Sequence, residues 1–371
     1  MPLLPLLFWL FFGVILVQIS YYLTFLFAYV SKPTSKIKGD ETLAISIIIC
    51  AKNEAANLEN NIPLLLEQDH KNFELILVND NSVDDSLVIM ENYARRFPSV
   101  KVVNVKSVES FWGNKKYALT LGIKSATKPF LVFTDADCRP RSNKWLKHIS
   151  SAFSKEKRIV IGYGAYKQVK GSLLNLIIRF ETLLTAIQYY SYSNLGMTYM
   201  GVGRNLAYHK DVFFDNAGYM QHMDIMSGDD DLFINNVATK SNVSIMDHPN
   251  SATVSEPKRN FSNWFRQKRR HITTSIYYRP IHKVLLGSFY LSQISFFVLS
   301  VALLINLYRW PIVLGLIVTR FLISGIVFYK GAKKLQEKSL NIFAPFLEVC
   351  LIIIQFFIFN INLISKPKHW N

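Results

Sequence analysis

The chain has 371 residues, of which 50% are hydrophobic, and a formal net charge of +16 from 42 basic and 26 acidic side chains. So apolar a composition excludes a disordered tail, which would lack hydrophobic residues. The three cysteines, Cys50, Cys138 and Cys350, lie far apart in the chain and therefore predict neither a disulfide framework nor a zinc site. A chain of this length is predicted to form two or three domains.

The first apolar segment begins at the N-terminus. No charged side chain precedes Lys32, and Leu3 to Val30 would extend roughly 42 Å as a helix, at about 1.5 Å per residue. Because a bilayer core is roughly 30 Å thick, residues 1–31 are predicted to be a transmembrane anchor. A basic start and a small-residue cleavage site are missing, so the anchor is expected to be retained. The lysines that follow place the next residues in the cytoplasm.

Residues 40–253 are predicted to form a cytosolic α/β domain with a mostly parallel sheet, because apolar runs alternate with helical stretches. Residues 43–50, 73–78, 100–105 and 129–133 are predicted to be buried strands. Polar clusters follow these strands at their carboxyl ends, where such sheets bind ligands. Residues 173–192 suggest an amphipathic helix, for which a position on lipid and a position in a packed core are both open.

Three clusters of carboxylates stand out in this domain. Asp135 and Asp137 follow a buried strand, and their oxygens suit a hard cation, Mg²⁺ or Mn²⁺, that bridges substrate phosphates. Residues 80–85 carry three carboxylates after another strand, and residues 229–231 are three consecutive aspartates. A solvated turn or a helix N-cap accounts for each cluster taken alone. The residues by themselves therefore leave a ligand site and a structural turn both open.

The segment 254–283 combines eight Lys or Arg and one Glu with aromatic side chains. Such a segment directly before an apolar one indicates an interfacial helix on anionic lipid, and nucleic acid is not expected as a partner of a membrane-tethered chain. Residues 284–365 are predicted to hold two to three C-terminal transmembrane helices, at 284–308, 311–329 and 342–364. Pro345 and Glu348 weaken the last one, for which a re-entrant or interfacial helix is the alternative.

Seven short motifs, taken in chain order, resemble those of membrane-bound family 2 glycosyltransferases with a GT-A fold, related to the cellulose synthase- and chitin synthase-like superfamily. The matching segments are Ser46–Glu54, Asn79–Asp84, Gly113–Leu119, Thr134–Asp137, Gly201–Asn205, Gly228–Leu232 and Gln267–His271. Three of them depart from the family pattern: Asn79 stands in place of Asp, Gly228 in place of Glu and His271 in place of Trp.

The resemblance implies a role for each matching residue. The nucleotide would be bound by Cys50, Ala51, Glu54, Asp80, Lys115 and Asp135. A divalent cation would be held by Asp135 and Asp137, and Asp229 would be the general base. The acceptor and the diphosphate would be contacted by Asp230, Gln267, Arg270 and His271.

The resemblance also implies an activity: an inverting, metal-dependent hexosyltransferase that moves a sugar from a UDP-sugar to a lipid-linked or membrane-associated hydroxyl. We expect the bacterial inner membrane as its location, a cytoplasmic catalytic domain and a role in cell envelope biosynthesis. A processive polysaccharide synthase is the alternative. It is disfavoured because His271 offers a smaller stacking face than Trp and because few spans remain to form a polymer channel. A minor alternative is a non-catalytic membrane scaffold or transporter.

Overall fold

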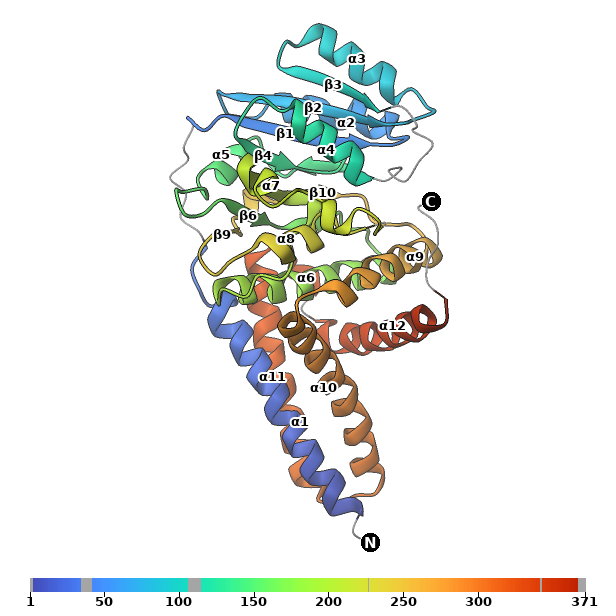
Figure 1. Cartoon of the computed structure of the whole chain (residues 1–371). Coiled ribbons are helices and arrows are strands. Elements are labelled where there is room, and N and C mark those ends of the chain that lie inside the picture. Colours follow the sequence, from blue (N-terminus) through green and yellow to red (C-terminus); the bar gives the residue numbers. More distant parts are fainter. Residues whose placement is uncertain (1–2, 35–41, 106–114, 226, 341, 366–371) are drawn as a thin grey trace. The chain divides into compact units, whose positions relative to one another are not determined.

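The computed structural model describes residues 3–34, 42–105, 115–225, 227–340 and 342–365. The chain forms two compact units (Figure 1). One is an α/β unit, which comprises mainly Thr34–Lys170 and Leu195–Arg259, and the other is a helical unit of Met1–Pro33, Gly171–Asn194 and Asn260–Pro367. Residues 171–194 thus belong with the apolar helices, although the sequence analysis counted them within the cytosolic domain.

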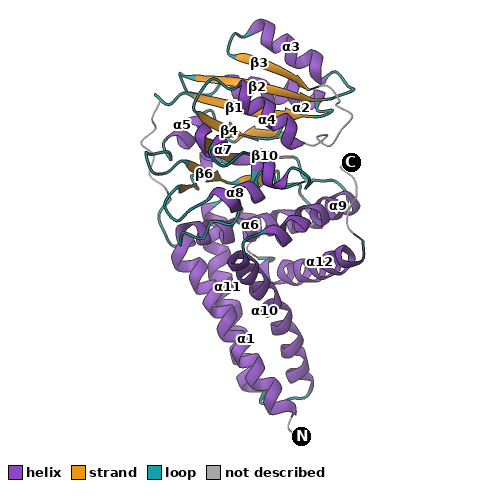
Figure 2. Ribbon diagram, viewed as in Figure 1, coloured by secondary structure: helices purple, strands orange, loops and turns teal. Residues whose placement is uncertain are grey.

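Two sheets build the α/β unit (Figure 2). The main sheet has the order β3-β2-β1-β4-β8-β6-β9 and the small sheet the order β5-β10-β7. The strands of the main sheet are β1 (Ile45–Ala51), β2 (Phe73–Asp80), β3 (Val100–Val105), β4 (Phe130–Phe133), β6 (Ile159–Gly162), β8 (Leu206–His209) and β9 (Val243–Met246). Those of the small sheet are β5 (Cys138–Pro140), β7 (Gly164–Tyr166) and β10 (Thr253–Ser255).

Helices connect these strands. They are α2 (Ala55–Leu66), α3 (Ser86–Arg96), α4 (Lys115–Ser125), α5 (Trp145–Ser150), α7 (Lys210–Phe214) and α8 (Asp231–Val237), with single 3₁₀ turns η2 (Gly203–Asn205), η3 (Met220–His222) and η4 (Pro249–Ser251). The core of this unit packs the strand side chains against α2, α3 and α5, and includes the buried Ile47, Leu75 and Trp145.

The prediction of a mostly parallel sheet is confirmed. Strands β3, β2, β1 and β4 pair in parallel, and β8 runs antiparallel to both β4 and β6. In the register, Ile48 lies opposite Ile76 on one side and Phe133 on the other, so the apolar runs found in the sequence are the strands buried on both faces. Because these strands are parallel, β1, β2 and β4 end at the same edge of the sheet, where the predicted polar clusters begin.

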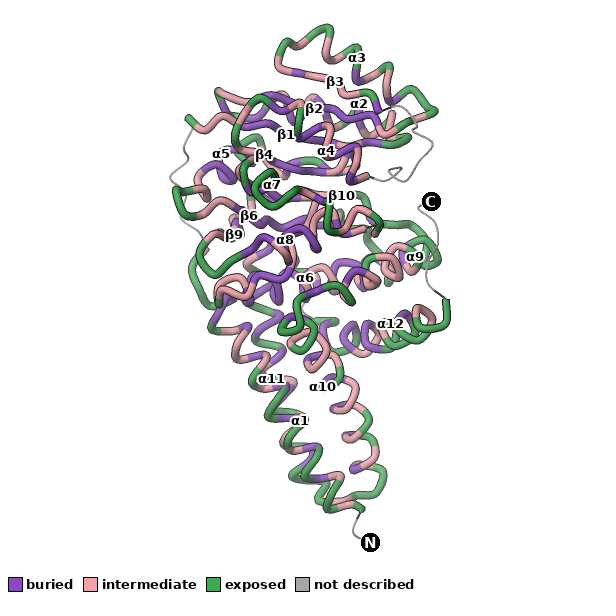
Figure 3. Tube along the Cα trace, viewed as in Figure 1, coloured by how far each residue is buried: buried purple, intermediate pink, exposed green. Residues whose placement is uncertain are grey.

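The helical unit holds four helices that are long and apolar enough to cross a membrane, among the residues that the structure describes. They are α1 (Leu3–Phe25, continued by the π-helical turn η1, Leu26–Val30), α10 (Pro280–Ile305), α11 (Trp310–Lys334) and α12 (Ala344–Ile364). Large apolar side chains such as Trp9, Val298 and Leu322 are exposed on them, as expected of a surface that faces lipid. Figure 3 shows exposed positions in green along these helices. The prediction of one N-terminal and two to three C-terminal apolar helices is therefore confirmed.

Helices α1, α10 and α11 lie along one another, whereas α12 crosses them (Figure 1). Glu348, the charged residue that weakened the prediction of a membrane span at α12, has partners in the structure. Glu348 forms a buried ion pair with Arg320 of α11 and accepts hydrogen bonds from Tyr22 at 2.8 Å and Gln293 at 2.9 Å. Gln18 accepts a further bond from Arg320 at 2.8 Å. Buried charges require such pairing, and the cluster joins α12 to the other three helices.

The basic segment 254–283 includes one amphipathic helix, and its interfacial position stays a prediction. It contains the end of β10, the amphipathic helix α9 (Phe261–Ile272), the 3₁₀ segment η5 (Thr273–Tyr277) and the start of α10. The helix predicted at 173–192 is α6 (Leu173–Asn194), which packs within the helical unit and buries most of its side chains, including Arg179 in an ion pair with Glu337. The short η6 (Lys338–Leu340) follows α11.

Candidate active site

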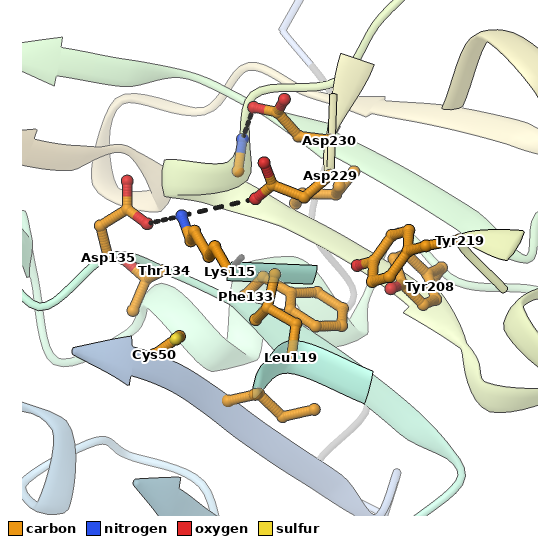
Figure 4. A pocket seen from close by; sticks show the side chains of 13 residues that line it. Cys50, Lys115, Leu119, Phe133, Thr134, Asp135, Tyr208, Tyr219, Asp229 and Asp230 are labelled. Atoms are coloured by element: carbon orange, nitrogen blue, oxygen red, sulfur yellow. Dashed lines mark hydrogen bonds and ion pairs between the residues drawn. The ribbon is translucent and has the colours of Figure 1, made fainter. Parts of the chain in front are cut away.

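A lysine joins two of the three carboxylate clusters. Lys115 is the first residue of α4, and its ammonium lies 2.7 Å from Asp135 Oδ1 and 3.4 Å from Asp229 Oδ2 (Figure 4). The three side chains line one cavity together with Cys50 at the end of β1 and Thr134 at the end of β4. The strand ends therefore bring together Cys50, Lys115, Asp135 and Asp229, which lie far apart in the sequence.

The charges at this site act on one another. Burial by itself would lower the pKa of Lys115, but the carboxylates of Asp135 and Asp229 outweigh it and raise that pKa well above the usual range. Lys115 therefore carries a positive charge at neutral pH. Burial raises the pKa of the Cys50 thiol, so Cys50 is an uncharged wall of the cavity and not a nucleophile.

Asp135, Asp137 and Cys138 place one potential ligand atom each within 4.8 Å of the others. The carboxylates suit a hard cation, whereas a thiol ligand would suit a softer one. Cys138 is engaged in other contacts: its sulfur lies 2.9 Å from Ser255 Oγ and donates to Asp137 Oδ1 at 3.4 Å, and burial raises its pKa. The residues present thus fit Mg²⁺ or Mn²⁺ held by Asp135 and Asp137, with Cys138 as a neighbour.

The aspartates at 229–231 differ in what they contact. Asp230 Oδ2 accepts the backbone N–H of Gly203 at 2.6 Å, and its Oδ1 caps α8 by accepting the N–H of Asp231 at 2.7 Å. Asp231 is buried and accepts from Leu232 N–H at 2.8 Å. Both side chains therefore organise the start of α8, and Asp229 is the one of the three that contacts Lys115. Burial and the neighbouring Asp229 and Asp231 raise the pKa of Asp230 to about 7.

Backbone geometry explains why Gly228 replaces the glutamate of the family motif. Its φ is +95°, a conformation that side-chain-bearing residues rarely adopt. A Cβ atom at this position would also lie 2.4 Å from the side chain of Leu232. A glutamate therefore cannot occupy this turn as it is built here.

The loops after β1 and β2 are tied to each other by side-chain to backbone hydrogen bonds. Asn53 Oδ1 accepts from Val83 N–H at 2.8 Å, Ser86 Oγ from Glu54 N–H at 2.8 Å and Asp84 Oδ2 from Ala55 N–H at 3.1 Å. Asp84 therefore has the structural role that an Asx turn or helix cap would predict.

Asp80 and Glu54 are half-buried beside this junction, and burial raises the pKa of each. The expected nucleotide-binding residues Ala51, Glu54 and Asp80 thus lie at the ends of β1 and β2. Their binding role stays a prediction.

The Gly201–Asn205 motif turns out to support the fold. Asn205 is buried, and its amide donates to the carbonyls of Tyr163 and Ser251 and accepts from the indole N–H of Trp145. Arg204 lies over the ring of Tyr166, 4.2 Å from its centroid, and donates to Ser255 Oγ at 3.1 Å. The motif thereby fixes the Gly203 N–H that Asp230 accepts.

Two further groups of expected residues remain to be placed. Gly113 and Asn114 lie outside the described residues. Gln267, Arg270 and His271 lie in α9 of the helical unit, and their assignment to the diphosphate and acceptor stays a prediction.

Sequence reasoning included Gly203 and Lys116 in its motifs but gave neither a role of its own. The ammonium of the buried Lys116 donates to the carbonyls of His222 and Ile225 and so supports the chain before Asp229. The pair of adjacent lysines in the motif was the available signal for Lys116.

Comparison with known proteins finds relatives for part of the chain. Residues 46–214 match the family described as "Glycosyl transferase family 2". Residues 46–214 thus carry the sequence of a family 2 glycosyltransferase domain. It is 31% identical over 124 residues to an uncharacterized glycosyltransferase, EpsJ, of Bacillus subtilis, covering 33% of this chain and 34% of that protein. It is 27% identical over 203 residues to the 4,4'-diaponeurosporenoate glycosyltransferase of Staphylococcus haemolyticus, covering 54% and 52%. The matches thus span about a third to a half of these relatives.

The fold is also similar to that of a solved mannosyltransferase. A mannosyltransferase from Pyrobaculum calidifontis, solved in complex with GDP-Man and Mn²⁺, superposes with a TM-score of 0.61 at 18% identity. The match covers 98% of this chain and 99% of that one. The α/β unit therefore has the GT-A-like fold that the motifs implied.

Proposed function

We propose that this family 2 glycosyltransferase transfers a sugar from a nucleoside-diphosphate sugar, with UDP as the expected nucleotide, to the hydroxyl group of a lipid-linked acceptor. The observation that carries the proposal is the convergence of Asp135, Lys115 and Asp229 at the carboxyl ends of β1 and β4. Asp135 belongs to the proposed cation-binding pair, and Asp229 contacts the same Lys115 ammonium. Such an arrangement provides separate positions for a diphosphate and for a base.

Asp229 is the proposed general base. Its carboxylate accepts the proton of the acceptor hydroxyl while that oxygen bonds to the anomeric carbon and the bond from this carbon to the diphosphate oxygen breaks. Asp230 is less suited to this task because both of its oxygens already accept backbone N–H groups. With Asp229 as the base and no carboxylate assigned as nucleophile, the proposed reaction is direct displacement with inversion at the anomeric carbon.

Asp135 and Asp137 are the residues that would hold Mg²⁺ or Mn²⁺. When bound, the cation supplies charge stabilisation for the leaving diphosphate. Lys115 adds a fixed positive charge at the same edge of the sheet, held by its contacts with Asp135 and Asp229. Removal of divalent cations with EDTA is therefore expected to abolish transfer, and Mn²⁺ or Mg²⁺ is expected to restore it.

Membrane topology supports a cytoplasmic site and a membrane-borne acceptor. The end of α1 and the end of α11 lie together: Lys334 donates to the carbonyls of Tyr29 and Lys32, and Lys330 to Ser31 Oγ. Basic residues gather on the cytoplasmic side of membrane proteins, so this end of the helices is the proposed cytoplasmic one. An acceptor carried by the same membrane would reach an enzyme anchored in this way.

The test measures release of the nucleoside diphosphate by the detergent-solubilised full chain, with a panel of UDP- and GDP-sugars and with membrane lipids as acceptor. Asp229→Asn is expected to lower turnover by about 10²–10⁴-fold, the usual contribution of a general base. The matched control is Asp211→Asn, which removes an exposed carboxylate paired with Arg158 in the same unit. Undiminished activity of Asp229→Asn would exclude Asp229 as the base.

Product length distinguishes the alternative of a processive polysaccharide synthase. A single added sugar on the lipid, seen by mass spectrometry, is expected. A ladder of longer products would favour the processive synthase instead.

A further inference from the structure

A second cavity lies wholly within the helical unit. It has a volume of about 340 Å³, within the range of small-ligand pockets, and its walls come from α6, η5, α10 and α12. Its apolar lining includes Leu184, Leu286, Phe289, Leu351 and Phe359. We call it the α6–α12 cavity.

Residues with polar groups, among them Glu181, Lys283 and Tyr290, interrupt this apolar lining. Glu181 of α6 is held by Lys268 of α9, 2.6 Å away, and the exposed Lys283 also lines the cavity. Tyr290 of α10 packs against Phe359 of α12 with ring centroids 5.0 Å apart, and its hydroxyl is buried without a hydrogen-bond partner among the described residues. A buried hydroxyl without a partner is unfavourable, so this one points to a ligand that supplies the partner.

The surroundings of the cavity identify the class of ligand. The helices that form it also carry exposed apolar side chains, among them Ile276, Val284, Leu291, Phe356 and Phe357. These side chains are typical of a surface in contact with acyl chains, so the cavity belongs to the lipid-facing part of the molecule. Lys283 is the lysine among the lining residues; its ammonium donates to the carbonyl of Ile276 at 3.2 Å and offers its positive charge to an anionic head group.

We propose that the α6–α12 cavity binds the hydrocarbon chain of the lipid acceptor next to its polar head, with the Tyr290 hydroxyl and Lys283 contacting the head group. The occupant is a single-chain amphiphile with a hydroxyl or phosphate head. The inference rests on the proposed function, because it assigns the acceptor of that reaction to a site. It also accounts for the position of α12, which the Arg320–Glu348 pair holds across the other helices so that Leu351 and Phe359 form one wall.

The test fills the cavity without disturbing the fold. Gly287 of α10 lines the cavity, and a Cβ atom placed on it meets nothing within 4 Å, so Gly287→Leu puts a side chain into the space that the acceptor chain would occupy. The matched control is Gly315→Leu in α11, where a Cβ atom also has nothing within 4 Å and which is not part of the lining. Both changes improve helix propensity equally, so a difference between them reports on the cavity.

Three quantities are measured on the full chain in nanodiscs of phosphatidylglycerol and phosphatidylethanolamine. They are the half-saturating amount of a lipid extract from the source membranes, hydrolysis of the nucleotide sugar without acceptor, and cross-linking to a diazirine-bearing hexadecyl phosphate. For Gly287→Leu we expect a rise in the half-saturating amount of at least about 10-fold, or about 1.4 kcal/mol. Donor hydrolysis should be unchanged, and cross-links to α6, α10 and α12 should be lost. Tyr290→Phe should weaken acceptor saturation without changing donor hydrolysis, because it removes the hydroxyl alone.

The outcomes separate the two proposals. If the wild-type chain transfers sugar to lipid and Gly287→Leu behaves like Gly315→Leu, the cavity assignment is wrong and the proposed function stands. If the wild-type chain hydrolyses the donor but modifies no lipid, the proposed function fails and the cavity assignment with it. Cross-linking to a two-chain phosphatidylethanolamine probe, together with unchanged kinetics of Gly287→Leu, would identify a structural phospholipid and overturn the assignment.

Discussion

The first prediction concerns Glu74, a buried carboxylate that links neighbouring strands in the main sheet of the α/β unit. This side chain of β2 is 5% exposed and lies 2.8 Å from the ammonium of Lys101 on β3. It also accepts hydrogen bonds from Ser46 Oγ on β1 at 2.6 Å and from the N–H of Thr127 at 2.6 Å. Burial alone would raise the pKa of Glu74, but these donors outweigh it and lower that pKa to about 2.

The lowered pKa of Glu74 determines how much its carboxylate stabilises the fold and over which pH range it does so. The pKa of Glu74 falls from 4.5 to about 2 on folding, and at about 1.4 kcal/mol per unit the ionised carboxylate stabilises the fold by about 3 kcal/mol at pH 7. Because the folded-state pKa is the lower one, this contribution is complete above pH 4.5 and is lost as the pH falls towards 2. At pH 3 about 1.4 kcal/mol remains.

Glu74→Gln keeps the shape of the side chain and removes its charge. Urea unfolding followed by tryptophan fluorescence, to which the buried Trp145 of the same core contributes, gives the free energy of unfolding of each variant. We expect a loss of about 3 kcal/mol at pH 7 that shrinks to about 1 kcal/mol at pH 3. The control Glu59→Gln, on the exposed face of α2, should change little at either pH. A Glu74→Gln loss of the same size at both pH values would refute the ionic explanation.

Three further predictions concern the site and the membrane helices. Lys115→Met should lower nucleoside diphosphate release by about 10²-fold or more, because it removes the charge between Asp135 and Asp229, whereas Lys124→Met on the same helix should not. Asp230→Asn should raise the melting temperature more at pH 8 than at pH 5, because the pKa of Asp230 is raised on folding and its ionisation destabilises the fold as the pH increases; an equal shift at both pH values would contradict this. Arg320→Met should destabilise the helical unit by about 3–5 kcal/mol in thermal unfolding, and Arg320→Met with Glu348→Leu should recover most of that loss; a double variant as unstable as the single one would contradict the pairing argument.

Local features of the chain predicted much of the α/β unit. The run Leu43–Cys50 indicated a strand buried on both faces, and β1 has parallel neighbours on both sides. The same alternation predicted that Asp80 and Asp135 follow strand ends at one edge of the sheet. These predictions succeeded because strand burial and the direction of parallel strands depend on residues close together in the sequence.

Roles within the acidic clusters could not be predicted from the residues alone. The sequence analysis left the structural and ligand-binding explanations of residues 80–85 and 229–231 open. The fold separates them, because Asp84 and Asp230 accept backbone N–H groups while Asp229 contacts Lys115. Those partners come from segments distant in the chain, and no local pattern encodes which carboxylate will meet them.

The sequence by itself thus determined the apolar helices, the buried strands and the motifs that mark a family 2 glycosyltransferase, because each depends on composition and short-range periodicity. Only the tertiary structure decided that Lys115 lies between two carboxylates, that α6 packs among the apolar helices and that Glu348 is neutralised by Arg320. Each of these depends on which distant side chains fold into contact. Glu348 weakened the prediction of a membrane span from the sequence, and in the structure its ion pair with Arg320 holds α12 in place.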